Sequence, residues 1–330
     1  MFVGGSYNTY IGRGLRSQTD AWLTFEGCMS HFHCSTGYTY DASAFGSTDS
    51  TTGEWQINTS PSITMGTDGF TVLKDGNTIT DQSSNSNNFT VYSGTLTKTE
   101  DCPSNVFATL NSLSKGIDQT LSNGNTTMVS GTATSRTPTQ TTLGMSSGKY
   151  YAEFKITTSD NTIPGIVNTQ DNSSVSRGTK YYPGSSSDGW GYTKAPDVRN
   201  NSSAVGGTWS TFAVGDIIGV AINLDNTQGG LNKLYFSKNG VWQNGTDPTD
   251  FDSVVGVVGV TPPASVPAGA YFFVMGDAAA DSSSKAIANF GNPDYANSSS
   301  GADANGFGDF EYAPPTGFYS ICTKNLAEFG

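Results

Sequence analysis

The stretch that decides the fold runs from residue 215 to residue 242 and reads GDIIGVAINLDNTQGGLNKLYFSKNGVW. Its first part alternates apolar side chains with small or polar ones, the apolar positions being Ile218, Val220, Ile222 and Leu224. Alternation with a period of two predicts a strand with one buried face. Further on, Asn239 and Gly240 separate two apolar runs, and both residue types tolerate positive φ, which favours a type I′ hairpin. The stretch therefore predicts antiparallel strands.

The same pattern recurs on both sides of this stretch. Residues 150–156 place Tyr150, Ala152, Phe154 and Ile156 on one face and Tyr151, Glu153 and Lys155 on the other. Further strands are expected at 234–237, 271–275 and 286–290, whereas no segment of ten or more residues shows a helical period. Residues 141–330 are therefore predicted to form an antiparallel β-sandwich.

The first third of the chain has weaker strand signals. Strands are expected at 10–12, 22–34, 70–73 and 88–92, with one helical turn at 41–45. Residues 111–140 are rich in Ser, Thr, Asn and Gly and are predicted to be a linker. The expected organisation is thus a module at 1–110, the linker at 111–140 and the sandwich at 141–330, an all-β protein throughout.

Composition narrows the class of protein. Aromatic residues make up 12% and charged residues only 13%, which argues against disorder. A formal net charge of −12 with 16 scattered Lys and Arg predicts no nucleic-acid partner. No stretch approaches 18 apolar residues, so we expect no membrane insertion, and the N-terminus has no secretory pattern.

The four cysteines are too few for a disulfide scaffold in a chain of 330 residues. Cys28 and Cys34 fall in one predicted strand, where six residues span roughly 20 Å, too far for a disulfide. Cys102 and Cys322 have no local partner. All four are predicted to be free thiols.

Catalytic patterns are poorly represented. Glycan-cleaving enzymes need two nearby carboxyl groups, but the glutamates are isolated in the sequence, at Glu26, Glu54, Glu100, Glu153, Glu311 and Glu328. With two histidines and no nucleophile elbow, a Ser-His-Asp triad has no support. We therefore predict no enzyme activity, with a carboxylate pair assembled from distant loops as the open alternative.

Metal-binding patterns are also weak, and we predict no bound metal and no cofactor. His31 and His33 share a strand face, with Asp41 nearby, but no third ligand is spaced to complete a zinc site. They fit hydrogen bonding on a sheet surface better. The weak calcium candidates are Asp68, Asp75 and Asp81, which lie on or near predicted loops. Ordinary turn chemistry explains aspartates in such places equally well.

Five blocks in order make the second region resemble a SPRY (B30.2) domain, a concanavalin-like β-sandwich. They read GKYYAEF at 148–154, DGWGY at 188–192, GDIIGVAINLD at 215–225, LYFSKNGVW at 234–242 and ANFG at 288–291. The resemblance implies a ligand-binding face built from loops at one end of the sandwich. The candidate ligand-binding residues there are Tyr181, Tyr182, Tyr192, Asp197, Arg199 and Trp242, whereas Trp190 and Trp209 are expected in the core.

The first region resembles part of a laminin-G-like or concanavalin-like lectin module of a kind common in tailed-phage proteins. The blocks are GCMSHFH at 27–33, YDASAFG at 40–46, GTDGF at 66–70, residues 81–89 and PSNVFATLN at 103–111, and the tail YSICTKNL at 319–326 is similar to those of phage structural proteins. Only about twenty residues precede the first block, so the module is expected to be incomplete here. A neighbouring subunit would then complete it, since exposed strand edges are usually covered.

These resemblances together imply a non-enzymatic bacteriophage virion structural protein: a tail fibre, spike or head-decoration subunit located in the virion. It would contact a host-surface glycan or protein through lectin-like modules, and assemble as a homo-oligomer or with other virion proteins. Two alternatives remain at this point. One is a glycan-processing enzyme on a concanavalin-like scaffold, and the other is a cytoplasmic SPRY adaptor.

Overall fold

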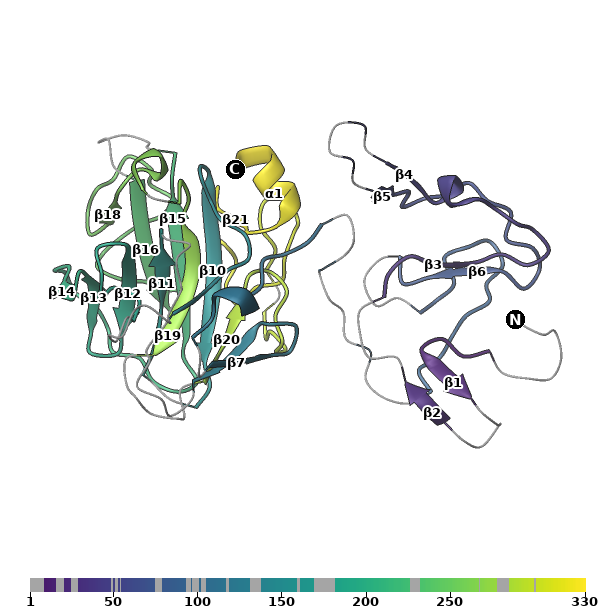
Figure 1. Ribbon diagram of the computed structural model, residues 1–330, viewed down its shortest axis with the longest axis horizontal. Coiled ribbons are helices and arrows are strands. Elements are labelled where there is room, and N and C mark those ends of the chain that lie inside the picture. Colours follow the sequence, from purple (N-terminus) through teal and green to yellow (C-terminus); the bar gives the residue numbers. More distant parts are fainter. Residues whose placement is uncertain are drawn as a thin grey trace. The chain divides into compact units, whose positions relative to one another are not determined.

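The computed structural model describes residues 9–15, 21–24, 29–48, 50, 53, 55–74, 79–92, 96, 101, 105–116, 119–130, 138–158, 161–168, 182–225, 232–266, 268–277, 285–299 and 301–330. The chain divides into two compact units, Met1–Cys102 and Pro103–Gly330, here called unit 1 and unit 2. Figure 1 shows both units with their strands labelled.

Unit 2 contains a nine-stranded sheet, composed of β7 (Gln119–Ser122), β8 (Thr127–Ser130), β10 (Lys149–Ile156), β15 (Ile217–Asn223), β16 (Asn232–Lys238), β17 (Val241–Trp242), β18 (Val258–Val260), β20 (Lys285–Asn289) and β21 (Tyr319–Ser320). The spatial order is β17-β16-β15-β10-β20-β8-β7, with β18 beside β16 and β21 beside β10. Figure 1 labels β7, β10, β15, β16, β18, β20 and β21 of this sheet. The short β21 pairs in parallel with β10, and the other pairings in this sheet are antiparallel.

A six-stranded antiparallel sheet packs against it, composed of β9 (Thr139–Gln140), β11 (Thr162–Val167), β12 (Gly189–Thr193), β13 (Asp197–Asn200), β14 (Ser203–Ala204) and β19 (Phe272–Asp277). Buried apolar side chains of both sheets form one continuous core, in which Phe154 and Phe273 each contact Phe290. Unit 2 is therefore an antiparallel β-sandwich, as the sequence predicted.

The alternation in the sequence identifies the inner face of the larger sheet correctly. The four inward positions of β10, at 150, 152, 154 and 156, are fully buried, and so are Ile218, Val220 and Ile222 of β15. The predicted hairpin is also confirmed: Lys238 pairs with Val241, while Asn239 and Gly240 have φ of 49° and 77°. Positive φ at both central residues is the type I′ geometry.

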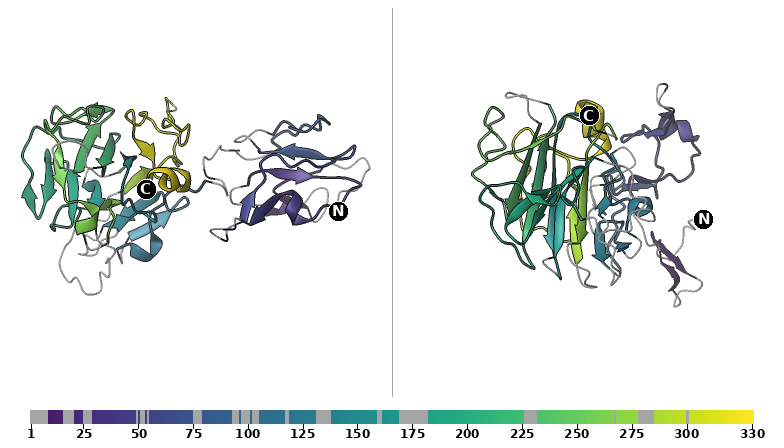
Figure 2. Two further views of the ribbon diagram at one scale, coloured as in Figure 1. Left: turned by 90° about the horizontal axis from the view of Figure 1, so that it is seen from above. Right: turned by 60° about the vertical axis from the view of Figure 1, so that its left-hand side comes forward.

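The outer face of the same sheet is buried as well, which the sequence did not predict. Tyr151 and Tyr235 belong to a second apolar cluster with Phe310 and Phe318 from the C-terminal segment. This segment, yellow in Figures 1 and 2, lies beside β10 and β20. The expectation that β10 is half-buried is therefore wrong, because the chain after β20 returns to cover the strand's second face.

Glu153 lies under this cover with no exposed surface. Its carboxylate accepts hydrogen bonds from the backbone N–H of Tyr312 (2.7 Å) and of Glu311 (3.0 Å). The Asn289 amide (3.1 Å) and the hydroxyls of Tyr151 (3.1 Å) and Tyr295 (3.3 Å) also donate to it. A single buried side chain thus joins β10 and β20 to the C-terminal segment.

Burial raises the pKa of Glu153 to about 7, although the hydrogen bonds from Tyr312, Glu311, Tyr151 and Asn289 oppose that rise. The sign follows from desolvation, because removal from water penalises the charged form of a carboxyl group. The folded chain therefore binds this proton more tightly than the unfolded chain does.

Helical structure is sparse in the described residues. The helix α1 (Thr323–Phe329) ends the chain, and two 3₁₀ turns, η2 (Ser112–Ser114) and η3 (Pro263–Ser265), belong to unit 2. The ring of Phe329 stacks on Tyr319 at 4.0 Å, and the Ser147 hydroxyl donates to the Phe329 carbonyl. These contacts fix α1 beside β21. No helix among the described residues is long and apolar enough to cross a bilayer.

Unit 1 has a different construction. Three two-stranded antiparallel sheets form in its described part: β1 (Arg13–Leu15) with β2 (Ala21–Thr24), β3 (Phe32–Cys34) with β6 (Phe70–Val72), and β4 (Gly46–Thr48) with β5 (Trp55–Ile57). The turn η1 (Ala42–Ala44) confirms the helical turn predicted at 41–45. The small buried core consists of Cys34, Phe70, Val72 and Leu73. These sheets do not form a sandwich in the described residues, so a second concanavalin-like module is not established.

Four sequence predictions need correction. Residues 111–140 are not a linker, because they contain η2, β7, β8 and β9 and supply strands to both sheets of unit 2. The strand expected at 22–34 is interrupted, and its ends form the separate strands β2 and β3. Residues 10–12 and 88–92 are not strands, and β1 begins only at Arg13. The polar residues at 111–140 are also common in loops and concealed the strands there, whereas short apolar or aromatic runs favour a strand without requiring one.

The free-thiol prediction is confirmed for Cys34 and Cys322, both of which are buried. Cys28 and Cys102 lie outside the described residues.

We predict that Glu153→Gln destabilises unit 2 by about 1–3 kcal/mol at neutral pH, because the amide NH₂ would face backbone N–H donors. The deficit should shrink as the pH rises from 4.5 to 7. The raised folded-state pKa means that the wild-type chain loses stability across this window, whereas a Gln side chain does not titrate. Urea unfolding of both chains at a series of pH values measures the difference.

The matched control is Glu328→Gln, which changes an exposed glutamate of α1. It should leave the free energy of unfolding within about 0.5 kcal/mol of wild type. A Glu153→Gln chain as stable as this control would show that the buried carboxylate does not hold the C-terminal segment.

Candidate functional site

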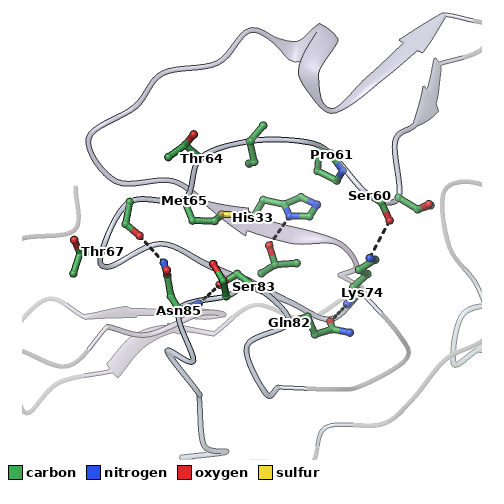
Figure 3. A pocket seen from close by; sticks show the side chains of 15 residues that line it. His33, Ser60, Pro61, Thr64, Met65, Thr67, Lys74, Gln82, Ser83 and Asn85 are labelled. Carbon is green, nitrogen blue, oxygen red and sulfur yellow. Dashed lines mark hydrogen bonds between the residues drawn. The ribbon is translucent and has the colours of Figure 1, made fainter.

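An open polar pocket of about 830 Å³ lies in unit 1, over the β3–β6 sheet. Its floor is formed by β3 and β6 and its walls by two loops, and Figure 3 shows the lining side chains. The lining consists of His33, Thr59, Ser60, Pro61, Ile63, Thr64, Met65, Gly66, Thr67, Thr71, Lys74, Gln82, Ser83, Ser84 and Asn85. Hydroxyl and amide groups therefore dominate the surface that it presents.

Asp81 organises the loop that forms one wall. Its Oδ1 accepts the backbone N–H groups of Thr71 and Ser83 (both 2.9 Å), and its Oδ2 accepts the Asn87 N–H and the Ser83 hydroxyl (both 2.8 Å). Burial alone would raise the pKa of Asp81, but these hydrogen bonds outweigh it and lower the pKa below its usual value. The ionised carboxylate thus ties residues 83–87 to β6.

Two amides and one phenol hold the opposite wall. The Asn85 amide donates to the carbonyls of Gly66 and Gly69, the latter at 2.9 Å. The Asn87 amide donates to the carbonyl of Gly69 at 2.9 Å. The Tyr40 hydroxyl accepts the Thr64 N–H at 2.7 Å. Both loops are therefore anchored by side-chain to backbone bonds, which leaves the pocket between them preformed.

His33 and Lys74 are the basic side chains of the lining. The His33 Nδ1 lies 2.9 Å from the Thr71 hydroxyl, and the Lys74 ammonium donates to the Ser60 hydroxyl at 3.0 Å (Figure 3). Burial, together with the positive charges of His31 and Lys74, lowers the pKa of His33. At neutral pH the imidazole is therefore uncharged, and Lys74 carries the positive charge of the pocket.

The predicted metal candidates do not assemble into a site. His33 hydrogen-bonds to Thr71 across the β3–β6 sheet, as expected for a histidine on a sheet surface. The expectation that His31 shares its strand face is wrong, because His31 precedes β3 with φ of 50°, and its Nδ1 lies 3.0 Å from the hydroxyl of the adjacent Ser30. No group of three His, Cys, Asp or Glu side chains able to hold a metal occurs within the described part of the chain. Asp81 is saturated by its own loop, Asp68 is exposed, and Asp75 lies outside the described residues.

The predicted ligand-binding residues of unit 2 are only partly brought together. Asp197 and Arg199 form an ion pair at 3.0 Å on β13, and the Tyr182 hydroxyl hydrogen-bonds to Arg199. Trp242 packs instead against Tyr151 and Tyr235 on the outer face of the larger sheet. Tyr181 lies outside the described residues.

Tyr192 requires a correction. Its ring is fully buried in the core between Trp209, Phe212 and Phe236, and its hydroxyl donates to the Ser210 carbonyl. It therefore cannot contact a ligand. Trp190 and Trp209 are buried as expected. Both faces of strand β12 are buried. The sequence did not show this, because the hydroxyl of a tyrosine is compatible with either a surface or a core position.

Sequence reasoning missed the pocket, because its lining is drawn from separate stretches between residues 33 and 85 that contain no recognised motif. The one usable signal was the polar run DQSSNSNN at 81–88. An Asp two residues before a Ser favours an Asx turn, which is the turn that forms here.

Comparisons with known proteins find no matching family model and no matching curated protein. Among solved structures, the chain is similar to the SPRY domain of human HERC1, at 17% identity and a TM-score of 0.36 over 52% of this chain and 91% of that one. A human SPRY domain matches at 17% identity and a TM-score of 0.35 over 53% of this chain and 96% of that one. The structure of stonustoxin matches at 16% identity and a TM-score of 0.38, over 57% of this chain and 27% of that one.

We predict that Asp81→Asn lowers the free energy of unfolding of unit 1 by about 1–3 kcal/mol, because one amide NH₂ would face backbone N–H groups. Hydrogen exchange should quicken at the Thr71, Ser83 and Asn87 amides, which now donate to this carboxylate. The wild-type contribution is complete above a pH of about 4 and is lost as the pH falls below it, because the folded-state pKa is lowered.

Asp68→Asn is the control, since Asp68 is exposed on a neighbouring turn. It should change neither exchange nor stability measurably. Added calcium should leave the unfolding of the wild-type chain unchanged, and stabilisation by calcium that Asp81→Asn abolishes would contradict the purely structural role of Asp81.

Proposed function

We propose that this protein is a non-enzymatic structural protein of a bacteriophage virion, and that the pocket of unit 1 binds a glycan on the host surface. The observation that supports binding most directly is the pocket itself. It is open, anchored on both sides and lined by hydroxyls and amides, the groups that hydrogen-bond to sugar hydroxyls. The sequence resemblance to tailed-phage proteins supports the virion context.

The chemistry of the lining favours binding over hydrolysis. Retaining and inverting glycosidases need two carboxyl groups about 5–10 Å apart across the scissile bond. The described lining of the pocket includes no Asp or Glu. Asp81, which precedes the lining residue Gln82, accepts four hydrogen bonds that occupy both of its oxygens. A bound saccharide would therefore meet no general acid and no nucleophile here.

We predict that Ser84→Trp abolishes glycan binding by the full chain, because an indole at this exposed lining position would fill the pocket without entering the core. The probe is an array of bacterial lipopolysaccharide and capsular saccharides. Thr90→Trp adds the same indole at an exposed position outside the lining and should leave binding intact. A wild-type chain that binds no saccharide, or binding that survives Ser84→Trp, would refute the proposal.

The construction of unit 1 supports assembly with further copies of the chain or with other virion proteins. A two-stranded sheet is marginally stable alone, and each has two unpaired edges. The described part of unit 1 has three such sheets over a small core. Large apolar side chains remain exposed beside them, among them Tyr38 (52%), Trp55 (48%) and Tyr92 (70%). Pairing between subunits would cover both the edges and these rings.

We expect light scattering at micromolar concentration to give a multiple of 34.6 kDa for the full chain. Trp55→Lys should shift the mass toward the monomer, because it places a charge on the exposed strand β5. Val241→Lys, at a position of unit 2 that is 66% exposed, is the matched control and should leave the mass unchanged. A monomeric mass for the wild-type chain would contradict the proposed self-assembly, and only assembly with other virion proteins would remain as the proposal.

A further inference from the structure

The pocket of unit 1 contains a positive charge that no carboxylate of the described residues neutralises. The Lys74 ammonium donates to the Ser60 hydroxyl at 3.0 Å, which uses one of its three N–H groups. The ion pairs of the described residues involve Lys149, Arg199 and Lys238, not Lys74. Lys74 therefore keeps donors available for a ligand.

The charge of the whole chain makes this arrangement unusual. The protein carries a formal net charge of −12, with 28 Asp and Glu against 16 Lys and Arg. The described lining of the pocket includes no Asp or Glu, and its two basic side chains come from neighbouring strands or their ends. A local positive potential in a pocket of an acidic protein favours an anionic ligand there.

The state of His33 limits how much negative charge the pocket accepts. Its lowered pKa keeps the imidazole neutral at physiological pH, so one positive charge remains. The imidazole edge and the hydroxyls of Thr59, Thr64 and Ser84 then supply neutral hydrogen-bonding groups around that charge. One ammonium among many hydroxyl partners suits a monoanion that carries several hydroxyl groups itself.

We propose that this pocket binds a sugar bearing a carboxylate, with that carboxylate on the ammonium of Lys74 and the sugar hydroxyls on the surrounding Thr and Ser side chains. The proposal rests on the glycan-binding function proposed above and specifies its ligand class. A hexuronic acid is the simplest sugar of this kind. A charge-assisted hydrogen bond contributes about 1.5–3 kcal/mol, so the carboxylate should improve affinity by about tenfold or more.

The test compares one glucuronate-containing capsular oligosaccharide with the same oligosaccharide after chemical reduction of its carboxyl groups to alcohols. The wild-type chain should bind the acidic form about tenfold more tightly, and high salt should narrow the difference. The Lys74→Gln variant should bind both forms with the same affinity, which should equal the affinity of the wild-type chain for the reduced form. Lys74→Arg should retain the preference, because it retains the charge.

Lys194→Gln removes an exposed lysine of unit 2 and controls for the general loss of one positive charge. Thermal unfolding of each variant shows whether it folds as the wild type does. Equal binding of the two forms by the wild-type chain would overturn the acidic-sugar inference and leave glycan binding intact. Binding of neither form, together with no binding on the wider saccharide array, would overturn the glycan function itself.

Discussion

Strand β10 can lie at the centre of unit 2 only because both of its faces are covered, and the cover on its outer face depends on the carboxylate of Glu153. A glutamate without exposed surface is costly unless its oxygens are hydrogen-bonded. Here five donors surround it, and two of them are backbone N–H groups of the segment that covers the strand. The hydrogen bonds to the Glu153 oxygens thus hold the cover in place, although burial disfavours the ionised form of the group.

The sequence predicts the parts of this arrangement that depend on residues close together in the chain, and it misses those that depend on distant segments. The inner face of β10 follows from the alternation of Tyr150, Ala152, Phe154 and Ile156, and the hairpin follows from two adjacent residues. The outer face could not be predicted, because Phe310 and Phe318 lie in a Gly-, Pro- and Asp-rich stretch without periodicity. The edge strand β7 and its neighbour β8 could not be predicted either, since they contain the polar residues that loops also use.

The candidate site follows the same rule. Local chemistry predicted that His31 and His33 form hydrogen bonds on a sheet surface, and the contact between His33 and Thr71 agrees with that interpretation for His33, whereas His31 lies before the strand. The pocket could not be predicted, because it depends on Asp81 reaching back to the Thr71 amide, ten residues earlier, and on Asn85 reaching the carbonyl of Gly69. Each of these bonds is formed by an ordinary loop residue, so no single position marks the site.

Two of the buried carboxylates, Glu153 and Asp81, support binding without catalysis as the better proposal for this chain. A carboxyl group with a pKa raised to about 7, as at Glu153, is often a sign of a catalytic acid. A catalytic acid must also reach its substrate, whereas Glu153 has no exposed surface and its donors come from three segments of the fold. Asp81 borders the open pocket, but four hydrogen bonds lower its pKa and occupy both of its oxygens. The group with the proton to give is sealed from solvent, and the group near the pocket has no proton to give. Under the proposed function, hydroxyls, amides and one ammonium hold the ligand in the pocket of unit 1, and neither Glu153 nor Asp81 serves as a general acid.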